Sequence, residues 1–233
     1  MFKFILSIVL ISSLLNGDTK EALNAFKKQD YDLAFKLYKE SADANNTTAQ
    51  NALSYLYFNG LGVKKSKEKG VLWLAKAANS EDIRAQNDLG MMYLTGQNVK
   101  QDSASAYTWL SKASDANNSN AQYNLALMYY RGDGIDQNVT KAAELLDAAA
   151  VQGNIDAKRN IGVVYMQLLK FDKAAFWLEQ NAAQGDENAY YLLAEIYCNK
   201  EEFSKAKSWA KKSKENGNKN AEVLWLKYNL EKY

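Results

Sequence analysis

The sequence predicts an all-α protein built from helix–turn–helix repeats that stack side by side. An alanine recurs along the chain, and apolar residues follow it four and eight places later, as in Ala85, Leu89 and Tyr93. This spacing places the three residues on one face of a helix. The chain contains no Pro and only 12 Gly, which suits helices joined by short turns. The recurring residues are Ala49, Ala85, Ala121, Ala157, Ala189 and Ala221.

Each repeat pairs a first helix, which carries this alanine, with a second helix that carries a Trp or Leu within an apolar stripe. The equivalent positions of the second helices are Leu37, Trp73, Trp109, Leu145, Trp177 and Trp209. We expect helices over 19–28 with 31–43, 47–58 with 66–79, 83–95 with 102–115, 119–131 with 138–151, 155–169 with 171–184 and 187–199 with 202–216. A last helix over about 219–232 would cap the array.

The repeat length changes along the chain. The alanines are spaced by 36, 36, 36, 32 and 32 residues, and we expect 36-residue repeats to about residue 156 and 32-residue repeats after it. The four residues are lost from the turn within a pair, because Gly60-Leu61-Gly62-Val63 has no counterpart between Met166 and Phe171. Gly and Asn favour left-handed backbone in such turns. Asn98 stands where Gly62 and Gly134 stand in neighbouring repeats.

These residues resemble a known repeat. Ala-x3-Leu-Gly/Ala-x2-Tyr-x2-Gly-x-Gly-Val, followed by Trp and Lys-Ala-Ala, is similar to the Sel-one-like repeat, a relative of the tetratricopeptide repeat. Gly60 to Val63 with Trp73 and 76–78 matches closely, as does the segment 121–134. The resemblance covers about residues 31–233, and the 32-residue units drift toward the tetratricopeptide form. It implies a right-handed α-solenoid of about six repeats whose concave surface binds proteins or peptides, and it implies no chemistry.

Composition excludes several functional classes. The chain has no His, which removes the commonest general base and zinc ligand. Cys198 is the only cysteine, so the chain can form neither an intramolecular disulfide nor a thiolate metal cluster. The net charge of +2 is too balanced for a nucleic-acid partner. We therefore expect no cofactor, no metal site and no nucleic-acid binding.

The N-terminus differs from the repeats. Lys3 precedes an apolar run from Phe4 to Leu15, which has the length of a signal-peptide core and is shorter than the roughly 20 residues that a membrane-spanning helix needs. We expect residues 1–17 to be a cleaved signal peptide and 18–233 to form the repeat domain. The mature protein would be periplasmic or secreted, with no stable membrane span.

Candidate binding residues lie on the first helices, two and six places after the recurring alanine. In relatives of the tetratricopeptide repeat the corresponding positions face the concave groove, and Tyr, Met and Arg suit protein recognition. Partial burial between neighbouring repeats is the competing interpretation. The predicted groove residues are Tyr55, Asn87, Met91, Tyr123, Leu127, Arg159, Tyr191 and Glu195, with Asn51 and Val163 at equivalent positions. The periodic aromatics Tyr57, Tyr93, Tyr129, Tyr165, Tyr197, Trp73, Trp109, Trp177 and Trp209 are instead expected in the core.

A second motif occurs three times, and its first two copies occupy equivalent repeat positions. Asn45, Asn117 and Asn138 each stand in acid-x-Asn-x-Ser/Thr, which resembles the extended sequon of bacterial periplasmic N-glycosylation. All three lie in predicted turns, where an attached glycan would face solvent. The alternative is that Asp and Asn are simply good turn and cap residues.

The sequence thus favours an exported, monomeric and non-catalytic adaptor that binds a protein or peptide. One alternative is the β-lactamase or penicillin-binding activity described for cysteine-rich members of the repeat family. Those members carry regular cysteine pairs, whereas this chain has Cys198 alone. Ser208-Trp209-Ala210-Lys211 matches Ser-x-x-Lys without a later Lys-Thr-Gly. A secreted factor that acts on a host or a competing cell is a third interpretation.

Overall fold

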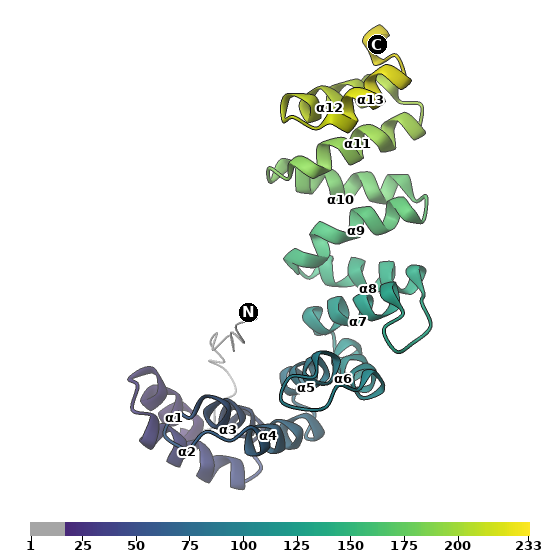
Figure 1. Ribbon diagram of the computed structural model, residues 1–233. Helices are drawn as coiled ribbons and strands as arrows, with labels where there is room; N and C mark the ends of the chain where they lie inside the picture. The colour runs from purple at the N-terminus through teal and green to yellow at the C-terminus, as the bar shows by residue number, and fades with distance from the viewer. Residues whose placement is uncertain (1–16) are drawn as a thin grey trace. The chain divides into compact units, whose positions relative to one another are not determined.

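The computed structural model describes residues 17–233 and shows helices joined by short turns (Figure 1). This part of the chain contains thirteen α-helices, one short 3-10 helix and no strand. The elements are α1 (Gly17–Lys27), α2 (Tyr31–Asp43), α3 (Thr47–Asn59), α4 (Lys67–Asn79), α5 (Ile83–Thr95), α6 (Ser103–Asp115), α7 (Ser119–Arg131), α8 (Val139–Val151), α9 (Ile155–Gln167), α10 (Phe171–Ala183), α11 (Glu187–Asn199), α12 (Phe203–Glu215), α13 (Lys219–Lys227) and η1 (Leu230–Lys232).

The helices form two compact units, residues 17–118 with α1–α6 and residues 119–233 with α7–η1. Within each unit, successive helices pack against each other as helix–turn–helix pairs. The predicted signal peptide, residues 1–17, lies outside the described residues except for Gly17, which begins α1. No helix over 17–233 has the length and apolar content needed to cross a bilayer.

Predicted and observed helix bounds agree to within about two residues, except at the last helix. The sequence predicted one helix over 219–232, but α13 ends at Lys227 and Asn229 adopts a left-handed φ of 49°. The chain then turns so that Leu230 is fully buried and the Lys207 ammonium donates to the Glu231 carbonyl at 3.0 Å. Burial of one leucine therefore outweighs continuation of the helix, since a buried Leu contributes about 2 kcal/mol.

The turns within the pairs come in two lengths. Seven residues join the helices at 60–66, 96–102 and 132–138, whereas three residues join them at 28–30, 168–170 and 200–202. This confirms that the four lost residues come from the turn. Asn98 has φ 63°, so it adopts the left-handed conformation of Gly62 and Gly134 at the equivalent positions.

The turns between pairs are uniform and carry helix caps. Each has three residues and ends on an Asn or Asp. The side chain of this residue accepts a hydrogen bond from the backbone of the following helix at Asn46, Asp82, Asn154, Asp186 and Asn218. Examples are Asn46 to the Ala49 N–H at 2.9 Å, Asp82 to Ala85 at 2.8 Å and Asn154 to Ala157 at 2.9 Å. Such a cap satisfies an N–H that the helix itself cannot pair, which fixes where each first helix begins.

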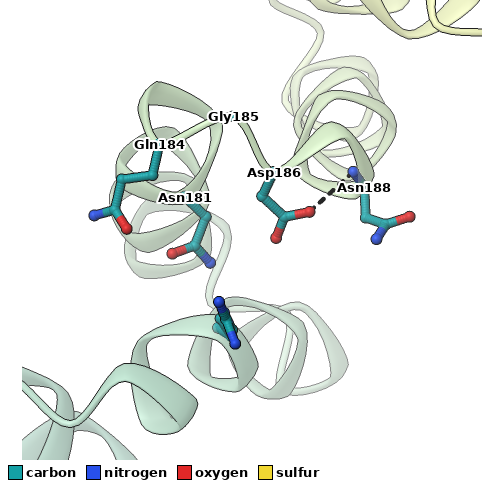
Figure 2. Close-up of a pocket in the computed structure, with 6 residues that line it drawn as sticks. Asn181, Gln184, Gly185, Asp186 and Asn188 are labelled. Atoms are coloured by element: carbon teal, nitrogen blue, oxygen red, sulfur yellow. Dashed lines mark hydrogen bonds between the residues drawn. The ribbon is translucent and has the colours of Figure 1, made fainter.

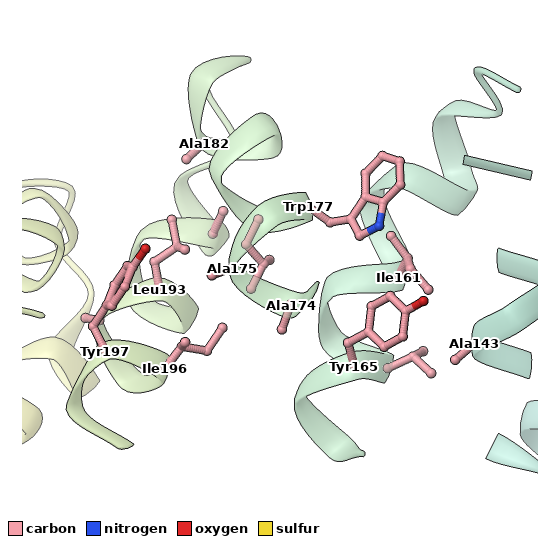
Figure 3. Packing of buried hydrophobic residues seen from close by; sticks show 14 of the residues in the cluster. Ala143, Ile161, Tyr165, Ala174, Ala175, Trp177, Ala182, Leu193, Ile196 and Tyr197 are labelled. Atoms are coloured by element: carbon pink, nitrogen blue, oxygen red, sulfur yellow. The ribbon is translucent and has the colours of Figure 1, made fainter. Parts of the chain in front are cut away.

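The core of each unit lies between the stacked helices. In residues 119–233, Ala174 and Ala175 of α10 lie between Ile161 of α9 on one side and Leu193 and Ile196 of α11 on the other (Figure 3). Small residues permit this approach. A Cβ added to Gly162 would come within 2.6 Å of Cγ of Leu178, and one added to Gly90 within 2.7 Å of Cγ of Leu110.

The periodic aromatics belong to the core, as predicted, although to different degrees. Tyr57, Tyr165, Tyr197, Trp73 and Trp177 are buried, and Tyr93, Tyr129, Trp109 and Trp209 are half-buried. The outer faces of three of the tryptophans are covered by the lysine three residues later. The ammonium groups of Lys76, Lys112 and Lys212 lie 4.0, 4.6 and 4.4 Å from the rings of Trp73, Trp109 and Trp209. These are cation–π contacts at helical spacing.

Candidate binding face of the first helices

The candidate binding face consists of the first-helix residues two and six places after the recurring alanine. None of the eight predicted groove residues is fully buried: Arg159 is exposed and the other seven are half-buried. Of the two equivalent positions, Asn51 is buried and Val163 is exposed. This pattern suits a surface, since partly exposed Tyr, Leu and Met can lose further area to a partner. The face is described below for each compact unit separately.

In residues 119–233, contacts across the face link α7 to α9. The Asn160 amide donates to the Tyr123 hydroxyl at 3.2 Å, and the Asn154 amide donates to the side-chain oxygen of Asn120 at 3.0 Å. Burial raises the pKa of Tyr123, and the nearby Asp156 carboxylate adds to the increase. Tyr123 therefore stays a neutral phenol, a rigid amphipathic group suited to protein contacts.

On α11, Tyr191 and Glu195 lie one helical turn apart. Burial raises the pKa of Tyr191, and the Glu195 carboxylate raises it further. Leu127 on α7 and Val163 on α9 add apolar surface to the same set of positions. The face of this unit thus alternates aromatic, apolar and charged side chains.

In residues 17–118, the face is more polar and more tightly held. The ring of Tyr55 packs edge-on against Phe26 of α1 with centroids 6.0 Å apart. The Asn51 amide donates to the Asp82 carboxylate at 3.4 Å. Asn87 donates to Asp88 at 3.1 Å, and burial raises the pKa of Asp88 to about 6. Asp88 was not among the predicted groove residues, and its position in the sequence beside Asn87 gave no sign of this raised pKa.

A pocket of about 420 Å³ adjoins the face of the second unit beside Arg159 of α9. Its other walls are Asn181 and Gln184 at the end of α10, Gly185 and Asp186 in the turn, and Asn188 at the start of α11. The side chains of Asn181 and Asp186 point into the same space below the turn, while Gln184 points away (Figure 2). Asp186 caps α11 by accepting from the Asn188 N–H at 3.1 Å.

Arg159 supplies most of the unused hydrogen-bonding capacity of this pocket. Its side chain is 68% exposed, and its one ion pair within 17–233 joins Nη1 to the Asp156 carboxylate at a distance of 4.0 Å. The buried Asn181, in contrast, donates to the Lys158 carbonyl at 3.0 Å and is thereby fixed. A planar guanidinium presents five donors, so the pocket can bind carbonyl and carboxylate oxygens.

Sequence reasoning identified Arg159 but missed the rest of the pocket. A signal was present at Asn181, because the equivalent second-helix positions hold small residues: Ala77, Ala113, Ala149 and Ser213. Asp186 and Gly185 could not be recognised, since every turn between pairs holds residues of these types. Only the approach of this turn to α9 gives them a common pocket.

The groups considered for metal binding and catalysis have the following surroundings over 17–233. No group of three or more Cys, Asp or Glu over 17–233 is placed to hold a metal ion. Cys198 is buried and free, and burial raises the pKa of its thiol to about 11, which makes it a poor nucleophile at neutral pH. In the Ser-x-x-Lys of α12, the Ser208 hydroxyl donates to the Ser204 carbonyl at 3.1 Å within the helix.

Comparison with known proteins establishes the family. The Sel1 repeat model matches residues 24–46, 47–82, 83–118, 119–154 and 157–186. The chain belongs to the Sel1 repeat family. The structure adds a sixth pair, α11–α12, whose helices lie beyond the last matched segment. No curated protein matches the chain.

Solved structures show the same fold. A Sel1 repeat protein from Oxalobacter formigenes is 27% identical, with a TM-score of 0.65 over 87% of this chain and 86% of that one. A protective antigen present in uropathogenic Escherichia coli strains, which displays an SLR fold, is also 27% identical, with a TM-score of 0.52. That match covers 90% of this chain and 56% of the antigen. The chain is therefore a Sel1-type helical-repeat scaffold, a class of protein that generally mediates protein interactions.

Proposed function

We propose that the protein is an exported, non-catalytic adaptor that binds a protein or peptide on the first-helix face of α7, α9 and α11. The observation that carries this proposal is Arg159, whose exposed guanidinium lines a polar pocket. Arg159 lies on α9, and half-buried Tyr123 and Tyr191 occupy the equivalent positions of α7 and α11. Stacked repeats of this kind present extended surfaces for binding.

The chemistry of the face fits a polypeptide better than an apolar small molecule. Small-molecule sites are enclosed and largely apolar, whereas this pocket is lined by Arg159, Asp186 and amide side chains. Amides and a guanidinium can pair with the N–H and C=O groups of a bound main chain. Tyr and Arg are also the residue types in which interface binding energy concentrates.

The surroundings of Cys198 and Ser208 are compatible with an adaptor. The sequence holds no His, and Cys198 is a buried thiol of raised pKa. The Ser208–Lys211 pair lies on the exposed side of α12 with the serine hydroxyl bonded within its own helix. Nothing in these contacts favours the β-lactamase alternative.

Export is proposed from the apolar segment 4–15 and would place the protein in the periplasm or outside the cell. One solved structure of the same fold, 27% identical, is that of a protective antigen present in uropathogenic Escherichia coli strains. A role in host interaction is compatible with the same surface.

The test compares two exposed basic residues that differ in location. Lys141 lies on the second helix α8, outside the first-helix face; its side chain is 49% exposed and, like that of Arg159, forms an ion pair with an acid on its own helix, Glu144 at 3.4 Å. Protein partners are captured by crosslinking in cells that produce the wild type, Arg159→Glu or Lys141→Glu, and are quantified by mass spectrometry. We expect the partner signal of Arg159→Glu to fall at least tenfold below that of the wild type and the signal of Lys141→Glu to stay unchanged.

Equal retention in both variants, with circular dichroism unchanged, would refute the assigned face. A wild-type chain that keeps residues 1–17 and stays in the cytoplasmic fraction would refute export. The two parts of the proposal are therefore tested independently.

A further inference from the structure

The acid-x-Asn-x-Ser/Thr segments all lie in turns of the structure. Asn45 follows α2, Asn117 follows α6, and Asn138 ends the seven-residue loop before α8. All three asparagines are exposed, as are the acids two residues earlier, Asp43, Asp115 and Asp136. A folded repeat protein thus presents every one of these sequons on its surface.

Asn138 has the most favourable geometry of the three. Its backbone N–H donates to the Tyr129 carbonyl at 2.8 Å, and its side-chain oxygen caps α8 by accepting from the Lys141 N–H at 2.9 Å. The side-chain Nδ2 donates to no residue within 17–233. An N-linked glycan attaches at Nδ2 and leaves the carbonyl oxygen in place, so the helix cap and a glycan are compatible.

Asn45 presents its side chain in a different way. Its backbone adopts a left-handed φ of 64°, and its backbone N–H donates to the Ala42 carbonyl at 3.0 Å. Its side chain forms no hydrogen bond with the residues that the structure describes. The next residue provides an internal comparison. Asn46-Thr47-Thr48 is also Asn-x-Thr, but Ala44 replaces the acid and Asn46 is half-buried as the cap of α3.

Turn formation alone does not account for this pattern. The turns between pairs need an Asn or Asp cap at their third position, which explains Asn46, Asp82 and Asn154. It explains neither the acid before Asn45 nor the Thr after it. The sequence contains four Asn-x-Ser/Thr triplets, at 45, 46, 117 and 138, and three of them follow an acid two residues earlier. Asn45 and Asn117 occupy equivalent repeat positions, so Asn138 is the independent instance.

We propose that Asn45, Asn117 and Asn138 are acceptor sites for an N-linked oligosaccharide, a proposal that depends on the export proposed above. The donor is an oligosaccharide linked to a polyprenyl diphosphate, and the catalyst is a membrane oligosaccharyltransferase. The Asn Nδ2 forms a bond to C1 of the first sugar as the bond from C1 to the diphosphate oxygen breaks. The polyprenyl diphosphate leaves with the electron pair, and one amide proton is lost.

A glycan at Asn138 would leave the binding face of the second unit open. The pocket beside Arg159 lies at the start of α9, near the turns between pairs. Asn138 lies after the end of α7, at the turns within pairs, which is the opposite edge of the stack. Modification at Asn138 therefore places bulk away from the pocket.

The experiment uses the full chain with its own N-terminus, produced in bacteria that carry such a transferase and its lipid-linked oligosaccharide. Intact mass and glycopeptide mapping are recorded for the wild type, Asn138→Gln, Asp136→Ala and Asn46→Gln. We expect the wild type to gain one oligosaccharide mass per occupied site. Asn138→Gln and Asp136→Ala should each lose the increment at 138, and Asn46→Gln should lose none.

The outcomes separate the two proposals. A processed chain, shortened by its signal peptide but without any increment, overturns the glycan sites and leaves export standing. An unprocessed chain without increments overturns both. Persistence of the increment at 138 in Asp136→Ala would show that the acid is irrelevant and would overturn the extended sequon. The Asp136→Ala variant keeps the α8 cap, so loss of its glycan cannot be assigned to misfolding.

Discussion

Helices pair in the same way whether a seven-residue loop or a three-residue turn joins them. In both cases the N–H of the last turn residue donates a hydrogen bond to the carbonyl of the recurring tyrosine. The Ser66 and Asp102 N–H groups donate to the carbonyls of Tyr57 and Tyr93 at 3.0 and 2.9 Å, and the Lys170 and Glu202 N–H groups donate to Tyr165 and Tyr197, both at 2.9 Å. Four residues can therefore be removed without moving the start of the second helix. The repeat length changes while helix pairing is preserved.

The loop 60–66 and the turn 200–202 differ in how they contact the preceding pair. In the loop 60–66 the backbone makes the contact: Gly62 lies so close to the start of α2 that an added Cβ would be 2.0 Å from the Tyr31 carbonyl oxygen. In the turn 200–202 a side chain makes it: the Lys200 ammonium contacts the Asp172 carboxylate at the start of α10 at 2.6 Å. Close packing is intolerant of change, whereas an exposed ion pair is adaptable.

The largest effect is expected for Gly62→Ala. The new methyl group would overlap the Tyr31 carbonyl, and the residue would also have to keep a φ of 62°. Overpacking and left-handed strain together predict a loss of about 3 kcal/mol in the free energy of unfolding. Gly153→Ala is the control, since its φ is 92° but nothing lies within 4 Å of the added Cβ. Urea denaturation should show a loss of only about 1 kcal/mol there, and equal losses would contradict the packing role.

An intermediate effect is expected from adding a helix cap to a three-residue turn and from removing one from a seven-residue loop. Lys170 directly precedes α10 and provides no side-chain cap, with φ −88° and ψ 65°. Asp30 in the equivalent turn has a similar backbone, with φ −80° and ψ 77°, and its side chain accepts a hydrogen bond from the Leu33 N–H. Lys170→Asp should therefore add a cap and gain about 1 kcal/mol. Ser66→Ala removes the cap of α4 and should lose about 1 kcal/mol. A thermal melt of both variants checks the pair, and a destabilised Lys170→Asp would refute the equivalence.

The smallest effect is expected at Lys200. Its ammonium also contacts the Glu202 carboxylate at 2.9 Å, and these hydrogen bonds raise the pKa of Lys200 and lower that of Glu202. Lys200→Met should cost about 0.5 kcal/mol at low salt, and less at 1 M salt.

The direction of the pH dependence at this site follows from the two shifts. The lowered pKa of Glu202 means that its contribution is present above the unfolded pKa of about 4.3 and is lost as pH falls through the folded value. The raised pKa of Lys200 means that its contribution is present below about 10.4 and is lost at higher pH. Denaturation of Lys200→Met at pH 3 and pH 7 should therefore differ less than that of the wild type.

Sequence periodicity was sufficient to predict the fold because the same local signals recur in each repeat. These signals are the recurring alanines, the Asn and Asp caps and the glycines of the long loops. Each signal specifies a helix start, a helix end or a close approach, and its recurrence in neighbouring repeats supports the assignment. The last helix was the exception, since its end depends on the burial of Leu230 against α12. That contact has no signature in the repeat pattern.

The candidate site was only half predictable for a related reason. Positions two and six after the alanine face the groove in relatives of the tetratricopeptide repeat, so Arg159, Tyr123 and Tyr191 could be named from that resemblance. The pocket needs the turn between α10 and α11 to approach α9, and turn residues carry no information about which helix they approach. Asn181 alone departs from its repeat pattern.

The sequence by itself determined the helices, their pairing and the change of repeat length, because these depend on spacings of at most a few residues. Only the tertiary structure showed that Gly62 packs against Tyr31 and that Arg159 shares a pocket with Asn181 and Asp186. It also showed that the last helix stops at Lys227, where the chain turns to bury Leu230. Those features depend on distances between residues that are far apart in the chain. Packing sets such distances, and a repeat pattern does not contain them.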